Sequence, residues 1–194
     1  MGLIRPDQSD VFISYARDDN ILWDESIHEF RNYMKRRFEA EMRNRFEIDH
    51  AVEADIFMDK VGLPANGSLS GALEKAVKTS LFLLIFVGSS YPRSRWCGKE
   101  LEYFVSQFAG NRLLALERTF VLVLDRPALY KNWGDYLEIP ERPIFESLFD
   151  DTTGRPIPML LENNEGKACP SPRFTARMRR ILDTMVERAI PLVV

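Results

Sequence analysis

A tryptophan, a cysteine and a glutamate fall close together after an apolar run at residues 82–87, in the stretch Ser94-Arg95-Trp96-Cys97-Gly98-Lys99-Glu100-Leu101. Residues four apart in a helix lie on the same face, so Trp96 and Glu100 are expected to project together. An indole stacks well on a flat ring while its N–H keeps a polar partner. An ionised carboxylate beside a developing positive charge stabilises the transition state more than the ground state. The spacing thus places an aromatic ring and a carboxylate side by side, an arrangement that could hold a flat ring beside Glu100.

Two more loops carry candidate binding residues, and each follows a predicted strand. The loop after residues 10–15 brings together an aromatic, a small and a basic residue, Tyr15, Ala16 and Arg17. The loop after residues 55–59 starts at an acidic residue and continues through an apolar turn, Asp59-Lys60-Val61-Gly62-Leu63-Pro64. The carboxyl ends of parallel strands meet at one edge of a sheet, where ligands bind. We therefore expect Tyr15 and Arg17 to line a cleft at this edge.

Short apolar runs without alternation predict strands that are buried on both faces. The clear runs lie at residues 10–15, 55–59, 82–87 and 120–124. A weaker run at 157–161 is interrupted by proline, which suits the edge of a sheet better than its centre. The stretch 126–158 carries five prolines and scattered aromatic residues, and it predicts irregular structure with one or two short helices.

Amphipathic patterns predict helices between these runs, at residues 24–46, 69–77, 96–108 and 172–189. The last helix has the clearest beginning, because Ser171-Pro172 places a capping residue before a proline at the first helical position. Strands that alternate with helices predict an α/β fold, a flavodoxin-like three-layer sandwich with a central parallel sheet of about five strands. The GxGxxG and P-loop fingerprints are absent from the sequence, which argues against the nucleotide-binding folds that use them.

The composition argues against several classes of function. A net charge of −3 and a pI near 5.6 give no general electrostatic reason to bind nucleic acid. The basic stretch 173–188 is best explained as the solvated face of a helix. No run reaches the ~18 apolar residues that a membrane span requires. Cys97 and Cys169 belong to no metal or redox motif and the chain has only two histidines, so we expect no metal site and a reducing, cytoplasmic setting.

The three loops together resemble the TIR (Toll/interleukin-1 receptor) domain family. Residues 10–19 are similar to the opening motif of that family, and residues 59–67 resemble its BB loop. The stretch around Glu100 resembles the Ser-x-Trp-Cys-x-x-Glu-Leu signature, and the three motifs occur in the expected order. The resemblance implies one TIR domain at 1–189, with a tail or the start of a linker at 190–194. Its parts are a motif-bearing core at 10–108, the proline-rich region at 126–158 and the last helix at 172–189. Residues 43–53 look like an insertion.

The resemblance also implies an activity. In TIR proteins that act as enzymes, the glutamate of the third motif is needed to cleave the nicotinamide–ribose bond of NAD⁺, and by position that residue is Glu100. The expected binding residues are Tyr15, Ala16, Arg17, Asp59, Trp96 and Cys97. NAD⁺ is then the substrate, no cofactor is required, and the product is ADP-ribose or a cyclic or conjugated ADP-ribose signal. Such enzymes act in immune, including antiphage, signalling. They assemble through a loop that corresponds here to Lys60-Val61-Gly62-Leu63-Pro64, and a sensor domain, fused or separate, is a further expected partner.

A second function fits the same motifs. A non-catalytic TIR adaptor would use these loops only to bind other TIR domains, and Glu100 would then be structural. Each residue has a simpler role as well: Trp96 as part of the core, Cys97 as a small buried hydrophobe, and Arg17 as an ion-pair partner of a neighbouring aspartate. Enzymatic relatives sometimes have an acidic residue where this chain has Val61. Release of free nicotinamide from NAD⁺ distinguishes the two functions.

Overall fold

Five parallel strands form the centre of the fold. The computed structural model describes residues 2–5, 7–23, 26–46, 53–58, 71–126, 144–162 and 168–192. Within these ranges the strands are β1 (Ser9–Tyr15), β2 (Ile56–Met58), β3 (Ser80–Val87), β4 (Thr119–Val123) and β5 (Ile144–Ser147). Their order in the sheet is β2-β1-β3-β4-β5. This arrangement confirms the α/β flavodoxin-like fold that the alternating pattern predicts.

The central strands are buried on both faces, as their unbroken apolar runs predict. All eight residues of β3 and all five of β4 are buried. The register aligns Ile13 of β1 with Leu84 of β3, and Leu84 with Phe120 of β4. Because side chains alternate along a strand, neighbouring residues of each strand enter opposite halves of the core.

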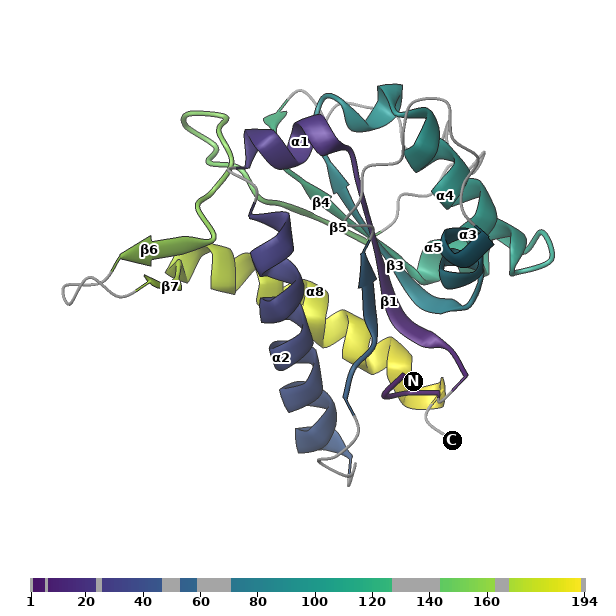
Figure 1. The fold of residues 1–194 in the computed structure, drawn as a ribbon. Coiled ribbons are helices and arrows are strands. Elements are labelled where there is room, and N and C mark those ends of the chain that lie inside the picture. The colour runs from purple at the N-terminus through teal and green to yellow at the C-terminus, as the bar shows by residue number, and fades with distance from the viewer. Residues whose placement is uncertain are drawn as a thin grey trace.

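Helices cover both faces of this sheet and give the fold three layers (Figure 1). One face carries α2 (Ile27–Arg45) and α8 (Pro172–Ala189). The other carries α3 (Gly71–Lys78), α4 (Arg95–Ser106) and α5 (Arg112–Glu117). The short helix α1 (Arg17–Leu22) and the 3-10 turn η1 (Tyr91–Arg93) lie at the carboxyl edge of the strands, and a second 3-10 turn, η2 (Ile190–Leu192), follows α8.

The face under α2 and α8 holds the larger half of the core. Most of the apolar stripe predicted for the first long helix is fully buried, at Ile27, Phe30, Met34, Phe38 and Met42. Its last member, Phe46, is half-buried just past the end of the helix. Phe30 meets Phe86 of β3 edge to face, with ring centroids 4.7 Å apart, and Phe174 of α8 in the same way at 6.1 Å. Each such ring contributes roughly 1.5–3 kcal/mol through burial. The predicted start of α8 is also confirmed, since the Ser171 hydroxyl accepts a hydrogen bond from the backbone N–H of Phe174.

Two expectations about the C-terminal half are wrong. The fifth strand of the sheet comes from residues 144–147, inside the region predicted to be irregular. The run at 157–161 lies outside this sheet, and its end belongs to β6 (Leu160–Glu162), which pairs with β7 (Ala168–Pro170) in an antiparallel hairpin. A buried glutamate interrupts the apolar pattern of β5. Glu146 is tolerated there because Arg177 and Arg180 of α8 approach its carboxylate at 2.9 and 3.4 Å.

The pattern also missed two short helices, α1 and α5, and placed several boundaries a few residues away from where they lie. The helix expected at 24–46 begins at Ile27, and the one expected at 96–108 spans 95–106. The basic residues of α8 are partly engaged, because Arg188 donates to the backbone carbonyl of Glu117 as well. In the part of the chain that the structure describes, no helix is both long enough and apolar enough to span a bilayer.

Asp150 ties the start of α8 to the loop that follows β5. Its carboxylate accepts hydrogen bonds from the backbone N–H groups of Thr152 and Thr153 at 2.8 and 2.9 Å, and it forms an ion pair with Arg173. The Thr153 N–H above all, and then the Arg173 guanidinium, hold the pKa of Asp150 at about 2 instead of 3.8. The ionised form is therefore favoured by the fold.

This arrangement predicts a pH-dependent contribution to stability. A carboxylate with a depressed pKa stabilises the fold above its unfolded pKa, and that contribution is lost as the pH falls through the folded value. Asp150→Asn should lower the free energy of unfolding near neutral pH. The difference from the parent should shrink between pH 3.8 and about 2. Urea unfolding at several pH values measures it, with exposed Asp7→Asn as the control. A difference that stays constant over that window would contradict the assignment.

Candidate functional site

The strand order reverses next to β1, and this creates the crevice in which flavodoxin-like folds bind ligands. After β1 the chain turns into α1 and then α2 on one face, whereas after β3 it turns into η1 and α4 on the other. β1 and β3 are neighbours in the sheet. The loops that leave their carboxyl ends therefore diverge, and the residues at this point are the first candidates for a site.

Glu100 lies at this point. It occupies the second turn of α4, whose first turn is capped by Ser94, with the Ser94 hydroxyl accepting from the backbone N–H of Cys97 at 3.3 Å. The Glu100 side chain is buried, with 7% of its surface exposed. Its carboxylate accepts a hydrogen bond of 2.5 Å from the hydroxyl of Ser14, near the end of β1. A hydroxyl that donates to an ionised oxygen makes one of the stronger hydrogen bonds in proteins.

The hydroxyl of Ser14 also lies 2.9 Å from the phenol oxygen of Tyr91 in η1. A serine hydroxyl has one proton, and here it is directed to Glu100, so Tyr91 is the donor in the second hydrogen bond. Both Ser14 and Tyr91 are almost fully buried. Three elements, β1, η1 and α4, thus meet on a single hydroxyl group.

Cys97 lies one turn before Glu100 and is buried. Burial, and then the negative charge of Glu100, raise the pKa of the Cys97 thiol to about 12. Only the thiolate is a strong nucleophile or metal ligand, so this cysteine is a neutral thiol at physiological pH. The arrangement agrees with the simpler of its two sequence-based roles, a small buried hydrophobe.

Two aspartates fix the loop between β3 and η1. Asp19 of α1 accepts hydrogen bonds from the backbone N–H groups of Gly88, Ser90 and Tyr91 at 3.0, 2.9 and 2.8 Å. Burial raises the pKa of the Asp19 carboxyl, and these backbone donors oppose that rise. Asp125, two residues after the end of β4, accepts from the backbone N–H and the hydroxyl of Ser89 at 3.0 and 2.9 Å. The loop that positions Tyr91 is therefore held from both sides.

The other residues expected at the site lie in different surroundings. Tyr15 is half-buried and packs against the core under α2 and α8, on the face opposite Ser14. Ala16 is buried in the core half that Glu100 borders, and Arg17 is exposed at the first residue of α1. Trp96 is half-buried against the same core half, with the Lys99 ammonium 4.9 Å from its ring centroid.

The loop expected to mediate assembly is not part of the described structure. Asp59 and the segment Lys60-Val61-Gly62-Leu63-Pro64 lie outside the described residues. Among the residues that are described, no group of three or more histidine, cysteine, aspartate or glutamate side chains is arranged to hold a metal ion.

Sequence reasoning missed Ser14, Asp19, Tyr91 and Asp125 as parts of the site. The signal for Ser14 was present, because strand alternation puts it on the same face as Phe12 and puts Tyr15 on the other. Phe12 does lie in the core half next to α4, and Ile13 in the other. The hydrogen bonds of Asp19 and Asp125 join residues 36 to 72 positions apart. No local pattern carries that information.

Comparison with known proteins adds a structural likeness to these observations. No protein-family model matches the chain, and no curated protein matches it. A solved structure of the activated Roq1 resistosome directly recognizing the pathogen effector XopQ contains TIR domains to which this chain is similar. The identity is 21%, the TM-score is 0.32, and the match covers 59% of this chain and 57% of that one. The chain thus spans under two thirds of that relative, and the site is assigned from its own geometry and motifs.

Two glycines near the site provide a matched test of how firmly Asp19 holds the loop after β3. A Cβ added to Gly88 would lie 2.5 Å from the Asp19 Oδ1 atom, and Asp19 is held by its three hydrogen bonds. Gly88→Ala should therefore lower the free energy of unfolding by about 1–3 kcal/mol, as overpacking does. Gly98 lies inside α4, and a Cβ added there would meet no described atom within 4 Å apart from its chain neighbours and the nearby backbone of α4 itself.

Gly98→Ala should instead raise the free energy of unfolding by about 0.5–1 kcal/mol, because alanine favours the helix. Urea unfolding of both variants near neutral pH measures the two effects. If Gly88→Ala is as stable as the parent, the carboxylate of Asp19 is not fixed as described.

Proposed function

We propose that this chain is a TIR-type enzyme that cleaves the nicotinamide–ribose bond of NAD⁺, with Glu100 as the catalytic residue. The observation that carries the proposal is the position of the Glu100 carboxylate at the point where the strand order reverses, hydrogen-bonded to Ser14 at 2.5 Å. The Ser-x-Trp-Cys-x-x-Glu-Leu motif around it supports the same assignment. Fold alone does not imply an activity, so the carboxylate and its surroundings are what must be tested.

The reaction requires one negative charge and no acid. The bond between the ribose C1′ atom and the pyridine nitrogen breaks, and its electron pair leaves with neutral nicotinamide. The ribose becomes oxocarbenium-like, as in glycoside hydrolysis. Attack by water, which then releases a proton to solvent, gives ADP-ribose. Attack by a ring nitrogen of the adenine gives a cyclic product, and another nucleophile gives a conjugate. Glu100 stabilises the common transition state of all three.

The size of this effect follows from electrostatics. A carboxylate about 4 Å from a unit positive charge, at an effective dielectric of about 20, contributes about 4 kcal/mol. That energy corresponds to roughly a thousandfold in rate. The neutral thiol of Cys97 adds no second anion next to Glu100. In this proposal Ser14 holds the carboxylate in place, Trp96 contacts the nicotinamide ring and exposed Arg17 meets the diphosphate.

The proposal extends to the biological setting. We place the enzyme in the cytoplasm, in immune or antiphage signalling, where it depletes NAD⁺ or makes an ADP-ribose signal. Both cysteines, Cys97 and Cys169, are free thiols, which fits a reducing compartment. TIR–TIR assembly, with a sensor domain as the trigger, would bring the activity under control.

Replacement of Glu100 by glutamine is the first test. The amide keeps an oxygen that can accept from Ser14 but removes the charge. Nicotinamide release from NAD⁺ should therefore fall by on the order of a thousandfold. Glu102→Gln is the matched control, because Glu102 is exposed on the same helix, and its rate should stay within about twofold of the parent. Chromatography of free nicotinamide gives the rates.

Two results would overturn the proposal in different ways. Equal rates for the parent and Glu100→Gln would show that the catalytic residue lies elsewhere. Absence of nicotinamide release by the parent at every protein concentration would leave a non-catalytic TIR adaptor as the function. Thermal unfolding of each variant confirms that the comparison is made between folded proteins.

Dependence on assembly is a separate prediction. The rate per molecule should rise with protein concentration, because the proposed site is completed by contact between TIR domains. Leu63→Asp, in the segment that the sequence assigns to assembly, should abolish this rise without loss of folding. Measurement of nicotinamide release over a concentration series, with light scattering for oligomer size, tests it. A rate per molecule that is independent of concentration would show that one domain is sufficient.

A further inference from the structure

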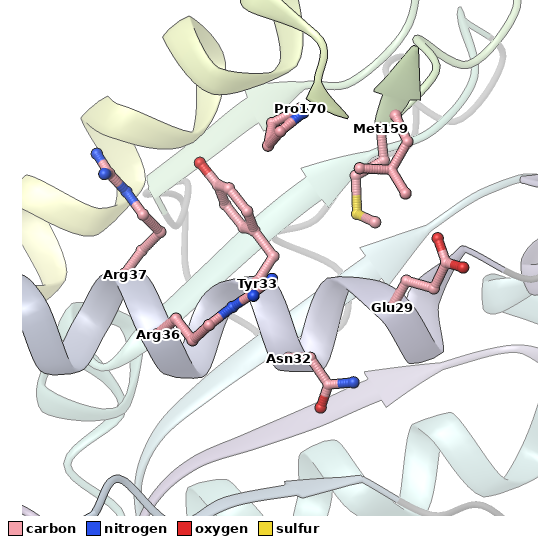
Figure 2. Close-up of a pocket in the computed structure, with 8 residues that line it drawn as sticks. Glu29, Asn32, Tyr33, Arg36, Arg37, Met159 and Pro170 are labelled. Atoms are coloured by element: carbon pink, nitrogen blue, oxygen red, sulfur yellow. The ribbon is translucent and has the colours of Figure 1, made fainter. Parts of the chain in front are cut away.

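A cavity of about 550 Å³ lies on the face of the sheet opposite Glu100, between α2 and the β6–β7 hairpin (Figure 2). Its volume is in the range of small-molecule sites. The helix contributes mostly polar side chains and the hairpin region apolar ones. Its lining residues include Glu29, Tyr33, Arg36, Arg37, Met159 and Pro170.

Arg36 and Arg37 give one part of this cavity a positive charge. Among the described residues neither guanidinium forms an ion pair, whereas Arg43 and Arg45 on the same helix pair with carboxylates at 3.8 and 3.7 Å. The Nε atom of Arg37 is buried and has no hydrogen-bond acceptor in the described part of the chain. A buried donor without an acceptor is costly, and such groups in folded proteins commonly mark the place of a bound water or ion.

The remaining walls suit an organic body attached to an anion. Met159 is buried, Pro170 caps the cavity from the hairpin, and the hydroxyl of Tyr33 is directed toward the end that holds Arg37 (Figure 2). Glu29 lies seven residues before Arg36, which places the two about 10 Å apart along the helix. Figure 2 shows the guanidinium groups of Arg37 and Arg36 on either side of Tyr33, with Glu29 farther along the helix. The cavity therefore offers two cations, an apolar wall and a hydrogen-bond acceptor.

We propose that this cavity binds an organic phosphate monoester of nucleotide size. Two guanidinium groups, one on either side of Tyr33, match the charge of about −1.5 to −2 on a phosphate monoester at neutral pH. The planar donors of a guanidinium fit phosphate oxygens. The apolar or aromatic body of the ligand packs between Met159 and Pro170. A hydroxyl or amino group on that body donates to Glu29. The site is separate from Glu100, because α2 and α4 cover opposite faces of the sheet.

Isothermal titration of the full chain with AMP, adenosine and inorganic phosphate tests the proposal. AMP should bind, and adenosine and inorganic phosphate should each bind at least about tenfold more weakly, because each lacks half of the required contacts. The double variant Arg36→Gln, Arg37→Gln should lose AMP binding by at least about tenfold. Arg45→Gln is the control, because Arg45 is an exposed arginine of the same helix that does not line the cavity. Its affinity for AMP should equal that of the parent.

Three outcomes would overturn the proposal: no binding of AMP by the parent, equal binding by the double variant, or inorganic phosphate binding as tightly as AMP. Should the double variant unfold, exposed Arg36→Gln alone keeps the test valid. Nicotinamide release by the arginine variants, measured in parallel, separates this site from the proposed function, because a failure at Glu100 leaves the AMP result unchanged.

Discussion

A carboxylate is stable inside a fold only when hydrogen-bond donors replace the water that it has lost, and this constraint organises the carboxyl edge of the sheet. Glu100 receives such a donor from Ser14, whose position follows from the pairing of β1 with β3. Since the single proton of Ser14 is used there, the hydroxyl must take its second hydrogen bond from Tyr91. One small polar side chain thus determines how α4, β1 and η1 meet.

The same edge depends on two more carboxylates that act on the backbone. Asp19 and Asp125 accept the N–H groups of residues 88–91, which have left β3 and have no strand partner. Gly88 and Tyr91 are buried, and an unpaired backbone donor at either would cost about 1–3 kcal/mol. In this arrangement the Asp19 carboxyl loses contact with water, and this desolvation raises its pKa. These hydrogen bonds fix the loop after β3 in the position that places the Tyr91 hydroxyl next to that of Ser14.

Many helices and strands of this fold can be predicted from local sequence patterns. The features that could not be predicted depend on contacts between residues far apart in the chain. The fully buried runs of β3 and β4 and the stripe of α8 predict their elements because one physical effect, apolar burial, dominates there. β5 escaped prediction because Glu146 breaks its pattern, and arginines about thirty residues later in the chain compensate its charge. Glu100 was proposed as a site residue from its motif. Ser14 and Tyr91 were not, because their roles exist only when three separate elements are packed together.

The position of the carboxylate depends on its hydrogen bond to β1, a strand in the centre of the sheet. β1 is paired on both sides, with β2 and with β3, and its residues fill both halves of the core. Ser14 sits one residue beyond its last pair with β2 and is still in register with Ile85 of β3. A group placed on paired strands and helices is held more accurately than one on a loop. If a transition state develops charge at this edge, the carboxylate that meets it needs little reorganisation, and that is the condition under which a single charge contributes fully to the rate.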